Sequence, residues 1–149
     1  MSAIWTPHLT VAAVIERNGE FLLVEEQSEG LRVFNQPAGH VEEDETIHEA
    51  VVREVLEETG CVFNPQGICG LYRWRSPRNL VTYLRVAFYG DCITPRGHIE
   101  LDTDIIATHW LNDAQIRARE NALRSPLVLR CIDDYQLGKQ LPLDILQEL

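Results

Sequence analysis

The segment between Thr46 and Gly60 is patterned as an amphipathic helix whose packed side ends in acidic residues. It opens with a capping box, in which Thr46 precedes Glu49 by three positions, and it closes at a glycine suited to the left-handed conformation. Along one face the residues are first apolar and then acidic: Ile47, Ala50, Val51, Glu54, Glu57 and Glu58. The fold must therefore provide a surface on which the apolar part of this helix packs and surroundings that stabilise its acidic end.

Carboxylates this close on one helix repel each other. Beside packed surface they raise each other's pKa values unless a positive charge lies among them. Magnesium meets this need, and manganese is the alternative, because both are hard cations that take oxygen ligands and can share them with substrate phosphates. The other interpretation is a solvated acidic face, which is common on surface helices. The stripe by itself leaves both interpretations open.

The remainder of the chain alternates strand and helix patterns without an internal repeat or a linker. We predict a hairpin turn at Asn18-Gly19, because both central positions of such a turn favour positive φ. Strands are predicted at residues 9–15, 21–24, 32–34, 67–74, 80–89 and 105–111, and further helices at 114–123 and 126–135. This order predicts one α+β domain over residues 1–149, with a mixed sheet and helices packed on it.

The formal charge of −10 limits the partners of the protein. An acidic surface repels DNA and RNA, so we expect no nucleic-acid polymer as a partner. No apolar run approaches the roughly 18 residues of a membrane span, and residues 1–7 lack a signal peptide, so we expect no membrane contact and a cytoplasmic location. An acidic site can hold an anionic substrate only when divalent cations lie between the two.

The four cysteines lack any C-x-x-C spacing, which argues against structural zinc: Cys61, Cys69, Cys92 and Cys131. We predict that they are buried thiols.

From Gly39 to Cys61 the sequence resembles the Nudix box, G-x5-E-x7-R-E-U-x-E-E-x-G-U, where U is aliphatic. The matching positions are Gly39, Glu45, Arg53, Glu54, Val55, Glu57, Glu58 and Gly60, and the one departure is Cys61 in the last aliphatic position. The resemblance implies an α/β/α sandwich with a loop-helix-loop motif. It also implies metal-dependent hydrolysis of a nucleoside diphosphate linked to another moiety.

The same resemblance implies roles for individual residues. Glu57 and Glu58 would be metal ligands, with the Gly39 carbonyl as an additional one. Glu54 would either bind metal or act as the general base. Arg53 would hold Glu54 or Glu45 by a charge-assisted hydrogen bond.

Many family members add a carboxylate six residues before a tryptophan, and here Asp104 precedes Trp110 by six. Asp102 is the near alternative and Glu100 a weaker one. Asp104 could also be only a turn residue at the start of a strand.

Flanking segments resemble the NudJ-type phosphatases of this superfamily, from about His8 to Ile145. They are residues 35–40, residues 123–128, and Tyr135-Gln136-x-Gly138 ahead of Leu141-Pro142-Leu143. The resemblance implies release of phosphate from nucleoside di- and triphosphates and from a thiamin-pathway pyrimidine diphosphate. The alternatives are a Nudix pyrophosphatase acting on ADP-ribose, dinucleoside polyphosphates or oxidised nucleotides, and a non-catalytic nucleotide-sensing module. We expect a monomer or a small homo-oligomer.

Residues outside the box are candidates for substrate binding. Strand alternation places Arg85 on one face with Tyr83, where it meets a carboxylate or reaches substrate phosphate. Trp74 offers a ring for a base or pyrimidine, with core packing as the alternative, and Arg75 and Arg73 could line the same pocket. Arg124 precedes a helix start that favours anions. His40 follows Gly39 and is a further residue to test.

Overall fold

Seven strands form the mixed sheet at the centre of the protein, and the computed structural model describes residues 2–149. The strands are β1 (His8–Arg17), β2 (Glu20–Ser28), β3 (Leu31–Asn35), β4 (Ala38–His40), β5 (Val62–Arg75), β6 (Thr82–Ile93) and β7 (Ile105–Asn112). The helices are α1 (Ile47–Thr59), α2 (Asp113–Arg117) and α3 (Leu127–Gln136), with short 3-10 turns at Glu120–Ala122 and Leu143–Ile145.

The strand order is β3-β2-β1-β6-β5, with β4 beside β1 and β7 beside β2. The pair β1 and β6 is parallel, from His8 opposite Tyr83 to Ile15 opposite Gly90, and the other pairs are antiparallel. The mixed sheet predicted from the sequence is therefore confirmed. Because β4 and β6 flank the first half of β1, residues of all three strands share one face near Thr10.

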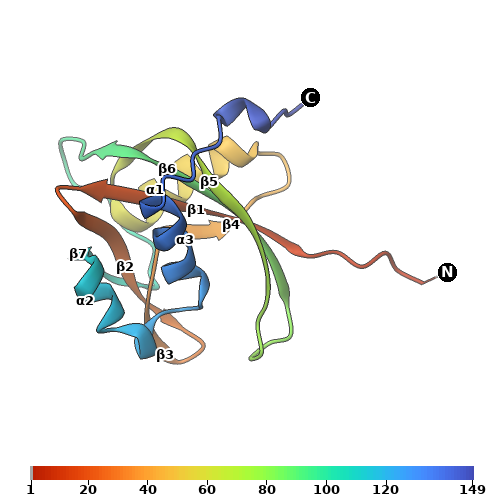
Figure 1. Cartoon of the computed structure of the whole chain (residues 1–149), viewed down its shortest axis with the longest axis horizontal. Helices are drawn as coiled ribbons and strands as arrows, with labels where there is room; N and C mark the ends of the chain where they lie inside the picture. Colours follow the sequence, from red (N-terminus) through yellow and green to blue (C-terminus); the bar gives the residue numbers. More distant parts are fainter. Residues whose placement is uncertain (1) are drawn as a thin grey trace.

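The two faces of the sheet bury separate cores. One core packs α1 on the sheet through Val51, Val55 and Phe88, among others. The other packs α3 on the opposite face through Val128 and Ile132, among others. In Figure 1, α3 (blue) lies in front of the strands and α1 (yellow) behind them. This is the expected α/β/α sandwich. Across residues 2–149, every helix is too short or too polar to cross a bilayer.

Local signals in the sequence place the turns and caps correctly. Asn18 and Gly19 adopt φ values of 54° and 81° in the β1–β2 hairpin. Thr46 accepts from the Glu49 N–H as a capping box, and Gly60 ends α1 with φ of 74°.

The helix expected over residues 114–123 is shorter, because α2 ends at Arg117. Pairing with β3 prevents the helix from reaching residue 123: Leu123 is extended and bridges to Phe34, and the Arg124 N–H donates to the Phe34 carbonyl at 2.8 Å. The next helix, α3, begins at Leu127, one residue later than a proline at the first helical position would place it.

Candidate active site

The acidic end of α1 is largely buried against the sheet. Glu54 and Glu58 are only 8% and 6% exposed, while the side chain of Glu57 is 40% exposed. Since Ala50, Val51 and Val55 are buried on the same helix, the apolar stripe does continue into glutamate. For Glu54 and Glu58 the alternative of a solvated acidic face is wrong.

Gly39 in β4 lies directly against the carboxylate of Glu54. A Cβ at this position would come within 2.5 Å of both carboxylate oxygens, so only glycine allows this approach. Glu54 is also one of three residues whose carboxylate oxygens lie within 4.8 Å of one another, the others being Glu57 and Asp102. The backbone N–H of Asp102 donates to the Glu57 carbonyl at 2.9 Å, which fixes the loop before β7 to the end of α1.

Asp104, the carboxylate expected from its spacing to Trp110, lies outside this cluster. It is exposed, and its carbonyl accepts from the Gln27 N–H at 3.0 Å, because the chain there already enters the pairing of β7 with β2. The near alternative, Asp102, occupies the expected place beside α1. Glu100 is not a member of the cluster either.

Arg53 holds the acidic groups together. It bonds to both of the partners that the sequence left open, Glu45 and Glu54. Its guanidinium donates to Glu45 at 2.9 and 2.6 Å, to Glu54 at 2.9 Å and to Glu57 at 3.1 Å. A fifth donor contact, at 3.0 Å, reaches the His40 carbonyl and ties α1 to β4. The guanidinium of Arg53 thus fixes the carboxylates relative to β4, the strand that carries Gly39.

Burial makes the carboxylates of Glu54 and Glu58 hard to ionise. It raises the pKa of Glu54 to about 7, although Arg53 opposes the shift, and nearby Glu57 and Asp102 add to it. It raises the pKa of Glu58 to about 9, against the hydrogen bond that its Oε1 accepts from the Ala38 N–H at 2.8 Å. A divalent cation would offset both penalties, so this donor set fits a hard metal ion.

A cavity of about 660 Å³ opens beside this cluster. Its lining comes from strands β1 to β6, from α1 and from the start of α3: Thr10, Glu26, Ser28, Glu29, Val33, Asn35, Ala38, Gly39, His40, Glu42, Glu54, Glu58, Trp74, Ser76, Pro77, Arg78, Asn79, Tyr83, Arg85, Glu120, Leu123, Arg124, Ser125, Pro126, Leu127 and Leu129. The volume falls within the usual range of small-molecule sites.

Three of the four predicted substrate-binding residues line this cavity: Trp74, Arg85 and Arg124. The ring of Trp74 stacks on Tyr83 with centroids 6.1 Å apart, and Arg124 pairs with Glu26 at 2.6 Å. Arg75 does not line the cavity: it is exposed, and its Nε donates to the Leu80 carbonyl at 3.3 Å.

Arg73 is exposed as well and lies over the ring of Trp5. Neighbours along a strand point to opposite faces, so once Trp74 faces the cavity, Arg73 and Arg75 cannot.

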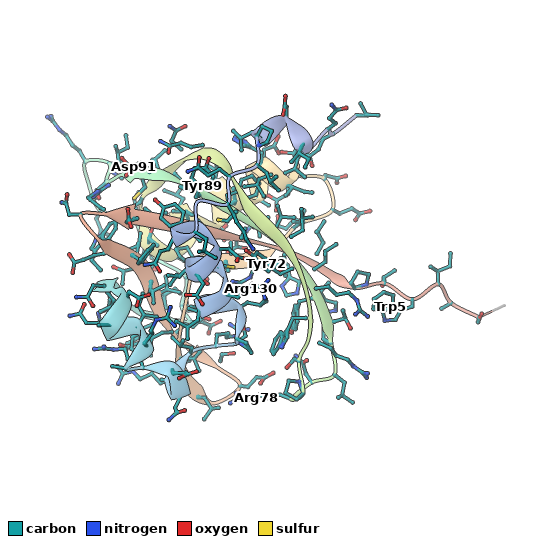
Figure 2. All side chains as sticks on the ribbon, in the orientation of Figure 1. Trp5, Tyr72, Arg78, Tyr89, Asp91 and Arg130 are labelled. Carbon is teal, nitrogen blue, oxygen red and sulfur yellow. The ribbon has the colours of Figure 1, made fainter. Side chains whose placement is uncertain are left out.

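Sequence reasoning gave no site role to two further lining residues, Arg78 and Tyr83. Arg78 lies in the turn after β5, at the tip of the β5–β6 hairpin (Figure 2), where no periodic pattern indicates direction. Tyr83 shares the face of Arg85 by alternation, which was a usable signal.

His40 lies at the cavity with its Nε2 3.0 Å from Nδ1 of His8. Burial, with a smaller contribution from His8, lowers the pKa of His40 below its ordinary value.

A mixed sheet between two helices, with an acidic helix end facing a cavity, is the architecture that the resemblance to the Nudix box implied. A family model for the NUDIX domain matches residues 6–130. The phosphatase NudJ of Escherichia coli strain K12 is 39% identical over 143 residues, which are 96% of this chain and 92% of that protein. The expected resemblance to NudJ-type phosphatases is thus confirmed.

Solved structures support the same family assignment. A NUDIX hydrolase from Nitrosomonas europaea is 47% identical with a TM-score of 0.94, over 97% of this chain and 98% of that one. The MutT protein from Methanosarcina mazei Go1 is 26% identical with a TM-score of 0.71, over 93% and 100%. The chain belongs to the Nudix family and is a Nudix hydrolase. Hydrolases of this family generally depend on a divalent metal ion.

Proposed function

We propose that the protein is a magnesium-dependent phosphatase that releases inorganic phosphate from nucleoside di- and triphosphates and from thiamin-pathway pyrimidine diphosphates. The observation that carries this proposal is the carboxylate cluster of Glu54, Glu57 and Asp102 beside a cavity with an aromatic wall. The 39% identity to a protein named as a phosphatase supports the choice of product. Manganese can replace magnesium in such an oxygen-ligand set.

Glu57, Asp102 and the Gly39 carbonyl would hold the metal ion, with Glu58 as a further ligand, and Glu54 would either join them or act as the general base. When bound, the ion supplies charge neutralisation and lowers the pKa of a water molecule. As general base, Glu54 would take or orient a proton of the attacking water while the water oxygen bonds to phosphorus. The phosphoanhydride P–O bond then breaks, and its bridging oxygen leaves with the other product. Arg53 keeps the carboxylates in position throughout.

Substrate recognition is assigned to the cavity. Trp74 and Tyr83 would stack on the ring of the organic moiety, and Arg85 and Arg124 would contact phosphate oxygens. The partner is therefore a small di- or triphosphate compound and not a nucleic-acid polymer. A cytoplasmic location and a monomeric or small homo-oligomeric state complete the proposal.

The test is a panel of nucleoside di- and triphosphates and thiamin-pathway diphosphates in magnesium, with phosphate and pyrophosphate measured separately. We expect phosphate release that EDTA abolishes and that added magnesium or manganese restores. Glu57→Gln serves as the matched variant, because it keeps the side-chain shape and removes one ligand charge.

Pyrophosphate release, or turnover only of ADP-ribose, dinucleoside polyphosphates or oxidised nucleotides, would favour the pyrophosphatase alternative. Nucleotide binding without any turnover would favour a sensor module.

A further inference from the structure

Arg85 of β6 is the most deeply buried of the cavity-lining arginines, and it is only 5% exposed. The other two arginines at the cavity are paired with carboxylates, Arg124 with Glu26 at 2.6 Å and Arg78 with Glu29 at 3.8 Å. Within residues 2–149, Arg85 instead forms its hydrogen bonds with neutral groups only. A buried guanidinium without a counter-charge is unfavourable, so something else must offset this charge.

The neutral partners of Arg85 are two side-chain amides, from Asn35 at the end of β3 and from Gln36 just after it, and the Cys131 Sγ at 3.8 Å. The Oε1 of Gln36 accepts from Arg85 at 3.0 Å, and the Oδ1 of Asn35 accepts at 3.2 Å. Gln36 is 1% exposed, and its Nε2 donates to the Val128 carbonyl of α3 at 2.8 Å. Aspartate or glutamate would have nearly the same shape and would neutralise Arg85. Amides hold the guanidinium in place and leave its charge intact.

The direction of this charge follows from the sheet register. Thr10 of β1 lies opposite both His40 of β4 and Arg85 of β6, so these side chains share one face of the sheet. The carboxylates of Glu54 and Glu58 line the same cavity, and so does the amino end of α3, whose dipole adds positive potential. Arg85 therefore supplies a fixed positive charge at one wall of a cavity whose carboxylate end fits a metal ion.

We propose that Asn35 and Gln36 are positioning residues that keep Arg85 uncompensated, and that Arg85 binds a phosphate oxyanion of the substrate. This inference rests on the proposed function, because it assigns the substrate anion at the same site. It adds a reason for the Asn35-Gln36 pair: the amides are selected for their lack of charge and not only for their fit. An acidic side chain in place of Asn35 should then compete with the substrate phosphate for Arg85.

The decisive variant is Asn35→Asp, which places a carboxylate on Arg85 without changing side-chain size. Asn35 suits this change better than Gln36, because the Gln36 amide nitrogen is already committed to the Val128 carbonyl. Asn35→Ala removes the amide and leaves Arg85 charged. Asn18→Asp makes the same chemical change at an exposed turn on the β1–β2 hairpin and controls for net charge.

Binding is measured calorimetrically in magnesium with methylene diphosphonate, a diphosphate analogue whose carbon bridge cannot be hydrolysed. We expect Asn35→Asp to weaken its binding by about 10- to 100-fold, the usual effect of losing a hydrogen bond to a charged group. Asn18→Asp should stay within about threefold. Asn35→Ala removes one of the amides that hold Arg85 but adds no negative charge, so its loss of affinity should be clearly smaller than that of Asn35→Asp. With a turned-over substrate, Asn35→Asp should raise KM more than it lowers kcat. Thermal unfolding of each variant confirms that it is folded.

The proposal is overturned if Asn35→Asp binds the analogue as tightly as the wild type does, or if Asn35→Ala loses as much affinity as Asn35→Asp. It is also overturned if the wild type shows no binding, or if Asn35→Asp weakens binding of the uncharged parent nucleoside equally. That last outcome would assign Arg85 to an acceptor on the organic moiety. Because the analogue is never hydrolysed, the result does not depend on which phosphoanhydride the enzyme cuts.

Discussion

Gly39→Ala should displace the Glu54 carboxylate without destabilising the fold. The backbone at Gly39 is outside the left-handed region, so alanine brings no conformational strain there. The new methyl group would lie within 2.5 Å of both Glu54 carboxylate oxygens, whereas carbon atoms normally approach other heavy atoms to about 3.5 Å. The carboxylate must therefore move by roughly 1 Å, while the rest of the site can stay in place.

A displacement of about 1 Å at a reacting group costs roughly 10²-fold in rate, or about 2.7 kcal/mol of activation free energy. The assay is kcat for phosphate release in magnesium, with thermal unfolding as the check on the fold. In a Glu54→Ala background the carboxylate is gone, so Gly39→Ala should add less than about threefold. A Gly39→Ala enzyme with wild-type kcat would refute the reasoning. So would an equal loss in both backgrounds.

Three further predictions address the carboxylates. Glu54→Gln should keep the fold and lower kcat by roughly 10²- to 10⁴-fold, and a variant with wild-type turnover would reject Glu54 as the base. Asp102→Asn removes one carboxylate of the proposed metal-binding cluster and should lower magnesium-dependent turnover by at least about tenfold, while Asp104→Asn stays near wild type; the reverse order would contradict the cluster geometry. Asp134 is buried, which raises its pKa, but hydrogen bonds led by Lys139 outweigh burial and lower the net pKa below its ordinary value. Its stabilising contribution is thus complete above about pH 4, the unfolded pKa, and is lost as pH falls through the folded value. Asp134→Asn should cost about 1–3 kcal/mol in urea unfolding at pH 7 and less below pH 4, and a pH-independent deficit would count against this account.

Local patterns in the sequence predict much of the fold. The capping box at Thr46, the turn at Asn18-Gly19 and the end of α1 at Gly60 depend on neighbours a few residues away, and each is found as predicted. The same holds for the acidic stripe, since the positions that share a helix face follow from its period alone. The stripe by itself left burial of Glu54 open, and the structure shows that this residue is buried.

The prediction that both Trp74 and Arg75 line the substrate pocket was wrong, and strand geometry alone could have excluded it. Adjacent residues on a strand face opposite sides, so Trp74 and Arg75 could not both line one cavity. Period alone would have excluded the pair, although it could not say which of the two faces the cavity. In the structure, Trp74 is the one of the two that lines the cavity.

The sequence by itself determined the caps, the helix with its acidic stripe, the mixed α+β architecture and the family, because these depend on local periodicity and on residues at fixed spacing. Only the tertiary structure decided which aspartate joins Glu54 and Glu57, because a backbone hydrogen bond from Asp102 to a helix end far along the chain makes that choice. It also decided that no helix extends to residue 123, because Leu123 is extended and pairs with Phe34 of β3. The neutral surroundings of Arg85 likewise come from segments about 50 residues away, and no spacing rule connects them.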